Sequence, residues 1–255
     1  MAEPASTPSR AEGSDGTAGM ARQPGERWSR FAARVGSAFG LVLLLVLATY
    51  VMTSLTDPVH GWSAVVIATL AASSAVVGLA SADARPVIVR YSIGFAAASI
   101  VLSLIGAVSG VSGWLGASSL IETLLLAIAA MAVLGAVVTE PEVGFRTILG
   151  AISVYVILAL LFTFCYAAID KLQGGPFFAG GVKPGQGDYV FFSLTTLTTT
   201  GYGNLVPAAQ PGKLVAGLEM LIGQVFLVTL IARLVSLWKP GQWAQLRRRR
   251  SGRET

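Results

Sequence analysis

The sequence predicts an all-α membrane protein with six transmembrane helices and one short re-entrant segment, and three observations support this fold class. Of the 255 residues, 54% are hydrophobic and 12% are charged, whereas soluble domains have about 25% charged residues. Six apolar runs of roughly twenty residues have the length that spans a hydrocarbon core as a helix. A seventh apolar stretch is too short to span the membrane, so it predicts a helix that enters and leaves on one side.

The six apolar runs divide the chain into four parts. The runs cover residues 36–55, 62–81, 87–108, 119–139, 145–169 and 212–238, and the first is slightly short. Residues 1–35 are rich in Ala, Gly, Ser, Pro and charge, so we expect a disordered cytoplasmic segment. The other parts are a four-helix transmembrane domain over 36–139, a second membrane domain over 145–238 and a basic cytoplasmic tail over 239–255.

Basic residues gather on one side of the predicted spans, and this sets the orientation of the chain. Because Lys and Arg near span ends stay cytoplasmic, we expect a multi-pass protein of the cell membrane with both termini cytoplasmic. The Ala, Gly and Arg bias favours a bacterial inner membrane. The net charge of +5 is a topology signal and gives no reason to expect a nucleic-acid partner. The clustered residues are Arg10, Arg22, Arg27, Arg30, Arg34, Arg85, Arg90, Arg146, Lys239, Arg247 to Arg250 and Arg253.

The short apolar stretch, residues 188–197, lies between the fifth and sixth runs. Asp188 is its predicted N-cap, with Gly187 before it. A helix from Asp188 to about Thr198 would direct its C-terminal carbonyls into the membrane, where the negative end of the helix dipole favours a cation.

The motif Thr198-Thr199-Thr200-Gly201-Tyr202-Gly203-Asn204 follows this stretch directly. Two glycines around one residue allow backbone conformations that other residues avoid, so successive carbonyls can turn toward one axis. Carbonyls arranged in this way replace the hydration shell of K⁺ in a selectivity filter. The Tyr202 ring is expected to point away from the ion, against neighbouring aromatic side chains. The predicted filter residues are Thr199, Thr200, Gly201, Tyr202 and Gly203, of which the first four supply carbonyls to K⁺.

Residues 145–238, with this motif between an outer and an inner helix, resemble the pore domain of tetrameric potassium channels, notably the bacterial ion-channel family. The resemblance implies a pore helix and a selectivity filter between the fifth and sixth transmembrane helices, and passive K⁺ conduction by a homotetramer. Three residues depart from the family pattern: Thr200 stands where Val is usual, Asn204 where Asp is usual, and Thr195 where Glu is frequent. Selectivity is expected to survive the first change, because the carbonyl faces the ion. The other two remove the carboxylates behind the filter.

Two other functions stay open, a less selective cation channel and a subunit of a potassium-uptake transporter. Loss of the Tyr-Gly half of the motif would favour the first, but Tyr202 and Gly203 are intact. Transporter subunits of this kind repeat the re-entrant unit within one chain, whereas this chain has a single unit. We do not expect an enzyme or a cofactor other than permeant K⁺, because the single His60 and the single Cys165 form no cluster with carboxylates.

The first four runs occupy the place of the voltage sensor in voltage-gated relatives. A sensor needs basic residues that move through the membrane field. Residues 119–139 contain no Lys or Arg, and their one ionisable residue, Glu122, is placed close to the outer end. The sequence therefore predicts only weak voltage dependence.

The sixth run contains a predicted cavity and gate. Gly223 lies 24 positions after Thr199, where relatives often have a glycine that lets the inner helix bend; close helix packing is the alternative. Residues at helical spacing share one face. The face predicted to line the cavity and its inner mouth consists of Gln224, Leu227, Ile231 and Val235.

Several further residues carry alternative predictions. Glu219 is an acid within the membrane, so it is predicted either to bond a Thr of the pore helix or to regulate gating by protonation. Arg233 is expected to snorkel to the inner headgroups. Phe177 and Phe178 are predicted to anchor a loop at the headgroups or to touch a neighbouring subunit.

Membrane lipids are expected partners of the protein. The block Arg247, Arg248, Arg249 and Arg250 is interpreted as a topology anchor or as a regulatory contact with anionic lipid.

Overall fold

The computed structural model describes residues 38–56, 61–140, 145–181 and 183–236, and most residues in these ranges are helical. The described residues form seven α-helices and one short 3₁₀ turn, with a single isolated β-bridge and no strand. The α-helices are α2 (Ala38–Leu55), α3 (Gly61–Ser81), α4 (Pro86–Ser109), α5 (Ser112–Thr139), α6 (Phe145–Leu172), α7 (Gln186–Leu197) and α8 (Gly212–Ser236); the 3₁₀ turn is η1 (Ala179–Gly181).

Five of the described helices, α3 to α6 and α8, are long and apolar enough to cross a membrane. The apolar part of α2, Phe39–Leu55, is shorter, in agreement with the expectation that the first run is slightly short. The helical class and the second to sixth predicted spans are therefore confirmed by length and composition, and the first span, residues 36–55, stays a prediction.

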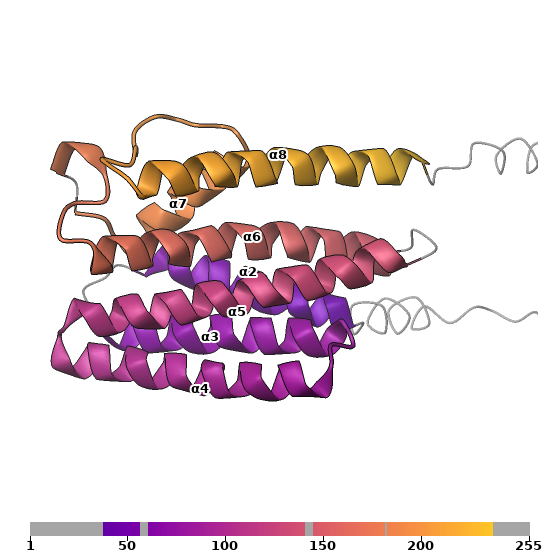
Figure 1. Cartoon of the computed structure of the whole chain (residues 1–255), viewed down its shortest axis with the longest axis horizontal. Helices are drawn as coiled ribbons and strands as arrows, with labels where there is room; N and C mark the ends of the chain where they lie inside the picture. Colours follow the sequence, from indigo (N-terminus) through magenta and orange to yellow (C-terminus); the bar gives the residue numbers. More distant parts are fainter. Residues whose placement is uncertain (1–37, 57–60, 141–144, 182, 237–255) are drawn as a thin grey trace, which may run out of the picture.

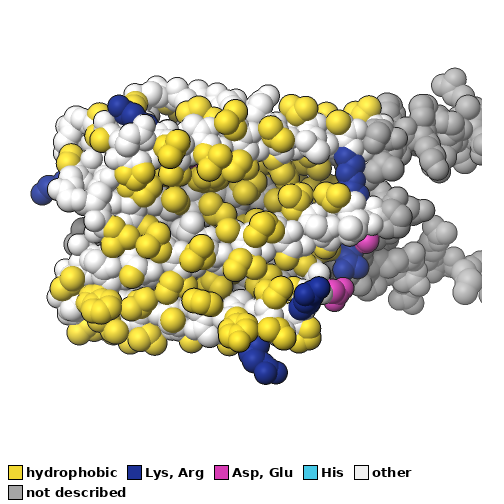
Figure 2. Space-filling model, viewed as in Figure 1, with side chains coloured by type: hydrophobic (Ala, Val, Ile, Leu, Met, Phe, Trp, Pro, Cys, Tyr) yellow, Lys and Arg dark blue, Asp and Glu magenta, His cyan; other side chains and the backbone are white. Residues whose placement is uncertain are grey.

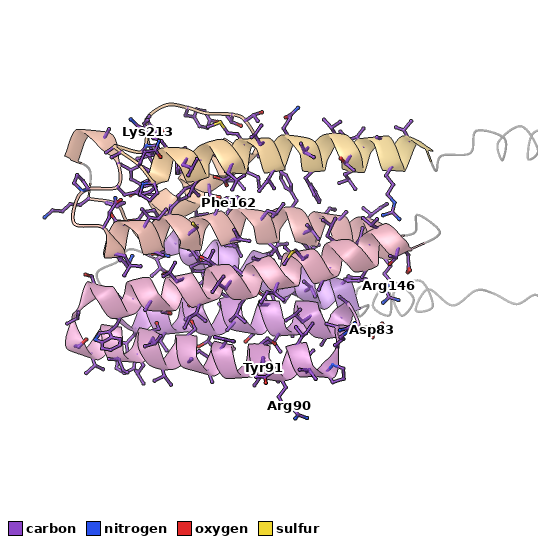
Figure 3. The ribbon with its side chains drawn as sticks, in the orientation of Figure 1. Asp83, Arg90, Tyr91, Arg146, Phe162 and Lys213 are labelled. Carbon is purple, nitrogen blue, oxygen red and sulfur yellow. The ribbon has the colours of Figure 1, made fainter. Side chains whose placement is uncertain are left out.

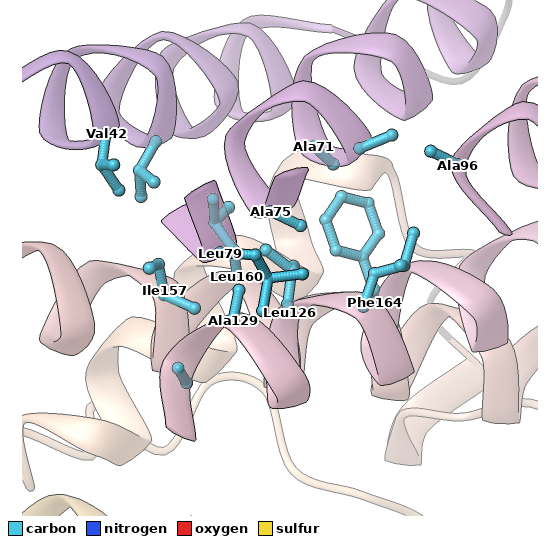
Figure 4. Close-up of a cluster of buried hydrophobic side chains, with 14 of the residues drawn as sticks. Val42, Ala71, Ala75, Leu79, Ala96, Leu126, Ala129, Ile157, Leu160 and Phe164 are labelled. Atoms are coloured by element: carbon cyan, nitrogen blue, oxygen red, sulfur yellow. The ribbon is translucent and has the colours of Figure 1, made fainter. Parts of the chain in front are cut away.

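The long helices lie nearly side by side, and α5 packs on α6 to join the first four helices to the rest (Figure 1). Figure 4 shows the buried cluster at this junction, which includes Ala71 and Ala75 of α3 and Ala129 of α5. Small side chains let helix backbones come close, which is the main source of packing energy between helices in lipid. Leu126, Ile157, Leu160 and Phe164 fill the remaining space.

The outer surface of the bundle is apolar, and charged side chains sit toward its two ends (Figure 2). Leu44, Phe95, Val101 and Met131 are each more than half exposed. In water such a surface would be costly, but against lipid tails it is the expected one. Figure 3 places Arg90 and Arg146 toward one end and Lys213 toward the other.

The structure corrects the start of the fourth predicted span. Helix α5 begins at Ser112, seven residues before the predicted start, because Gly110 takes a left-handed conformation (φ 70°) and turns the chain directly from α4 into α5. A Cβ at Gly106 would lie 2.8 Å from the side chain of Leu115, so this turn needs glycine there.

The longer α5 places Glu122 about 15 Å from the start of the helix, at 1.5 Å per residue, and not close to the outer end. Its carboxyl is buried and accepts hydrogen bonds from Ser99 (2.9 Å) and Ser118 (3.1 Å). Glu122 therefore belongs to a polar contact between α4 and α5.

Candidate functional site

The short helix α7 leads into the Thr-Thr-Thr-Gly-Tyr-Gly motif. With 12 residues, it is about 18 Å long, too short to cross a bilayer. Asp188 is not the N-cap, because the helix begins at Gln186 with Gly185 as its cap. The Asp188 carboxylate instead accepts the backbone N–H of Gly185 at 2.8 Å, and its negative charge favours the N-terminal end of the helix dipole.

The backbone after α7 alternates in handedness. Thr199, Gly201 and Gly203 have positive φ angles of 58°, 51° and 79°, whereas Thr200 and Tyr202 between them do not. A β-branched residue rarely takes a positive φ, so Thr199 is held in a strained conformation, as is common at functional sites. Backbone of alternating handedness can turn successive carbonyls toward the same side of the chain.

Hydrogen bonds from the C-terminal turn of α7 hold the start of this loop. The amides of Thr200 and Gly201 both donate to the carbonyl of Thr195, at 2.8 and 3.1 Å, and the amide of Thr199 donates to Thr196 at 3.0 Å. Within the described residues, no hydrogen bond ends on the carbonyls of residues 199–202. The N–H groups are thus used in anchoring, and the carbonyl oxygens are available to a ligand.

The Tyr202 ring stacks on Phe191 of α7, with the ring centroids 5.8 Å apart and the planes at 13°. This agrees with the prediction that the ring points toward a neighbouring aromatic residue. The ring is 71% exposed in the single chain.

An aromatic cluster holds α7 between α6 and the loops that flank it. Phe177 and Phe178 are buried and pack against Tyr189 and Phe192 of α7. Both predictions for the two phenylalanines, a headgroup anchor and a contact with a neighbouring subunit, are therefore wrong. The segment after the loop is tied to the same cluster, since the amide of Ala208 donates to the Phe177 carbonyl at 2.8 Å.

Two residues of α8 face this assembly. The Glu219 carboxyl is buried and lies 2.5 Å from the hydroxyls of both Tyr166 and Ser193. Its partner on α7 is therefore a serine and not the expected threonine. One turn further, a Cβ at Gly223 would lie 2.6 Å from the Leu197 carbonyl oxygen, so this glycine allows α8 to touch the end of α7.

The predicted cavity-lining face of α8 points away from its partners in the chain. Helix α8 packs on α6 and α7, and its Phe226 and Leu230 pack in a cluster with residues of α5 and α6. Ile231 and Val235 are 58% and 63% exposed, and Gln224 is also exposed. Leu227 is half-buried.

Arg233 does not reach toward headgroups as expected. Its guanidinium donates to the backbone carbonyls of Val137 (2.5 Å) and Glu140 (2.8 Å) at the end of α5. The last carbonyls of a helix have no partner within the helix, so the arginine caps α5 and ties it to the last turns of α8.

Some predicted residues lie outside the described ranges. These are His60, the basic residues of the N-terminal segment, Lys239, the arginine block 247–250 and Arg253. Among the described residues, no group of three or more His, Cys, Asp or Glu side chains could hold a metal ion.

Comparison with known proteins gives a match to one protein family over part of the chain. Residues 150–239 match the family model described as ion channel, and the match covers most of α6, all of α7, the loop and α8. No match was found among curated proteins or solved structures. The matched segment and the apolar helices indicate a membrane protein and support ion-channel function.

Proposed function

We propose that the chain forms a potassium-selective channel that conducts K⁺ passively. The observation that carries the proposal is the loop 199–203, with alternating φ angles and carbonyls that accept no hydrogen bond within the described residues. K⁺ must lose most of its water to enter a narrow filter, and carbonyl oxygens held in fixed positions replace that water. The carbonyls of Thr199, Thr200, Gly201 and Tyr202 bind the ion, with Gly203 at the outer end.

The proposed assembly is a homotetramer around a central pore. One loop supplies carbonyls on one side of an ion only, so several copies must surround it. Two surfaces support this arrangement, the exposed Tyr202 ring and the exposed face of α8 that includes Leu221 and Val225, which are 67% and 64% exposed. In the tetramer, Gln224, Leu227, Ile231 and Val235 line the cavity below the filter.

Helix α7 acts as the pore helix. Its C-terminal end is joined to the filter by the bonds at Thr195 and Thr196, so the negative end of its dipole lies at the inner end of the ion path. There it stabilises a cation that has left bulk water.

The proposed location is a bacterial inner membrane with both termini in the cytoplasm. The N-terminal end of α2 and the C-terminal end of α8 lie at the same end of the bundle (Figure 1). This is the end toward which Arg90 and Arg146 lie (Figure 3), and basic residues favour the cytoplasmic side. Membrane lipids contact the apolar surface.

Ion flux into proteoliposomes tests the proposal. Vesicles that contain the purified protein and are loaded with both K⁺ and Na⁺ should release K⁺ rapidly while retaining Na⁺. Gly201→Ala should abolish the K⁺ flux, because a left-handed conformation costs a residue with a Cβ about 1–2 kcal/mol in each subunit, and Gly201 has φ 51°. Equal release of the two ions by the unsubstituted protein would favour a less selective cation channel.

A further inference from the structure

A buried polar cluster behind the proposed filter joins three helices. Tyr166 of α6, Ser193 of α7 and Glu219 of α8 all have side chains with 0% exposure. Tyr166 Oη lies 2.5 Å from Glu219 Oε2, and Ser193 Oγ lies 2.5 Å from Glu219 Oε1. Ser193 Oγ also lies 2.8 Å from the Ala159 carbonyl oxygen of α6.

These three oxygen–oxygen contacts need three protons, because two oxygens at hydrogen-bond distance repel unless a proton lies between them. The hydroxyls of Tyr166 and Ser193 supply two. The Thr163 hydroxyl cannot supply the third, since it already donates to the same Ala159 carbonyl at 2.8 Å. The remaining proton must come from the carboxyl of Glu219.

We propose that Glu219 is an uncharged, protonated carboxyl that positions the pore helix. In this arrangement Glu219 donates to Ser193, Ser193 donates to the Ala159 carbonyl, and Tyr166 donates to the second oxygen of Glu219. Each buried oxygen contact then has its proton. The network fixes α7 against α6 and α8 at one point.

Charge balance favours the same protonation state. A buried carboxylate needs a cation beside it, and no salt bridge to Glu219 is present among the described residues. Tyr155 and Cys165 of α6 also lie close enough to interact electrostatically with Glu219. Both are uncharged at neutral pH in their ordinary state, so they supply no counter-charge.

An ionised Glu219 is the competing arrangement. It would accept one charge-assisted bond from Tyr166 and one from Ser193, and both contacts are short enough for such bonds. In that arrangement the single Ser193 hydroxyl proton would have to serve both the Glu219 contact and the 2.8 Å contact with the Ala159 carbonyl. Otherwise the contact with Ala159 would have no proton. The two arrangements differ in whether Glu219 donates a proton.

The position of the network links it to ion selection, and this part rests on the proposed function. Ser193 lies one helical turn before Leu197, and Glu219 lies one turn before Gly223, which touches Leu197. Two successive turns of α7 are thus fixed against α8. The carbonyls that anchor the filter, those of Thr195 and Thr196, lie between these two points.

Glu219→Gln and Glu219→Leu separate the two arrangements. The amide of Gln can donate to Ser193 and accept from Tyr166, so the Gln variant should keep its K⁺ flux and its selectivity over Na⁺ within about twofold, because both hydrogen bonds survive. Leu has neither group, so this variant should lose K⁺ selectivity or assemble less stably. Glu122→Gln is the matched control, since Glu122 is also a buried acid but contacts α4.

Infrared spectroscopy of the same proteins reads the protonation state without ion flux. The unsubstituted protein should show a carboxylic-acid C=O band that is lost in Glu219→Gln. Failure of the Gln variant to assemble or conduct, or an unchanged band, would overturn the proposal. If the unsubstituted protein does not conduct K⁺, the proposed function fails, while the band and the thermal stabilities of the Gln and Leu variants still decide the state of Glu219.

Discussion

Gly223 offers a test of how closely α8 must approach the end of α7. A Cβ at this position would lie 2.6 Å from the Leu197 carbonyl oxygen and 2.8 Å from Leu197 Cδ1. Gly223→Ala therefore forces α8 away from the end of α7. Overpacking of this kind costs about 1–3 kcal/mol, and it is partly offset by the higher helix propensity of Ala, worth about 1 kcal/mol.

Gly217→Ala in the same helix is the matched control, because a Cβ at Gly217 meets no atom of the chain within 4 Å. The Gly217 variant gains the same helix propensity, and its added Cβ has no steric clash. We expect the Gly223 variant to be less stable than the Gly217 variant by about 1–3 kcal/mol per chain, and to conduct less K⁺ because the carbonyl of Leu197 moves. The assays are thermal unfolding in detergent and K⁺ flux in proteoliposomes. Equal stability and flux of the two variants would refute the close contact and favour a glycine used only for bending.

Three other predictions concern Arg233, the first four helices and the arginine block 247–250. Arg233→Gln should lower the thermal stability and shift the open probability, since hydrogen bonds from a charged group contribute about 1.5–3 kcal/mol. Arg90→Gln, at an exposed position, is the control and should change neither property. Equal effects of the two substitutions would exclude a specific contact between Arg233 and α5. Conductance should depend only weakly on voltage, because α5 contains no Lys or Arg; a steep conductance–voltage curve would contradict this. A variant in which Arg247, Arg248, Arg249 and Arg250 are all changed to Gln should bind anionic vesicles more weakly and have an altered open probability, with unchanged K⁺ selectivity. Unchanged gating of this variant in anionic bilayers would mean that the block is only a topology anchor.

The sequence predicted the helices where long apolar runs are bounded by clear breaks. The start of the fifth run at residue 145 and of the sixth at residue 212 coincide with those of α6 and α8. The start of α5 was missed, because residues 112–118 are rich in Ser and Gly and resemble a loop. Their helical state depends on packing, as at Gly106 and Leu115, which a local pattern does not contain.

The candidate site was predicted in part for the same reason. The glycines of the 199–203 loop reveal its backbone conformation, since the need for positive φ is local. The partners of Glu219 lie 26 and 53 positions away in the sequence, and those of Arg233 lie 93 and 96 positions away. Contacts at such separations depend on how the helices are arranged, and no spacing rule indicates them. An intramembrane acid indicates that a partner exists, but not which residue it is.

The reversal potential of the purified protein in a planar bilayer tests the central claim most directly. With both ions on both sides, K⁺ more concentrated on one side and Na⁺ on the other, the carbonyls of the 199–203 loop should pass K⁺ and exclude Na⁺. The current should therefore reverse close to the K⁺ equilibrium potential. A reversal potential that follows the Na⁺ gradient, or one that ignores both gradients, would contradict the proposal that this loop is a potassium filter.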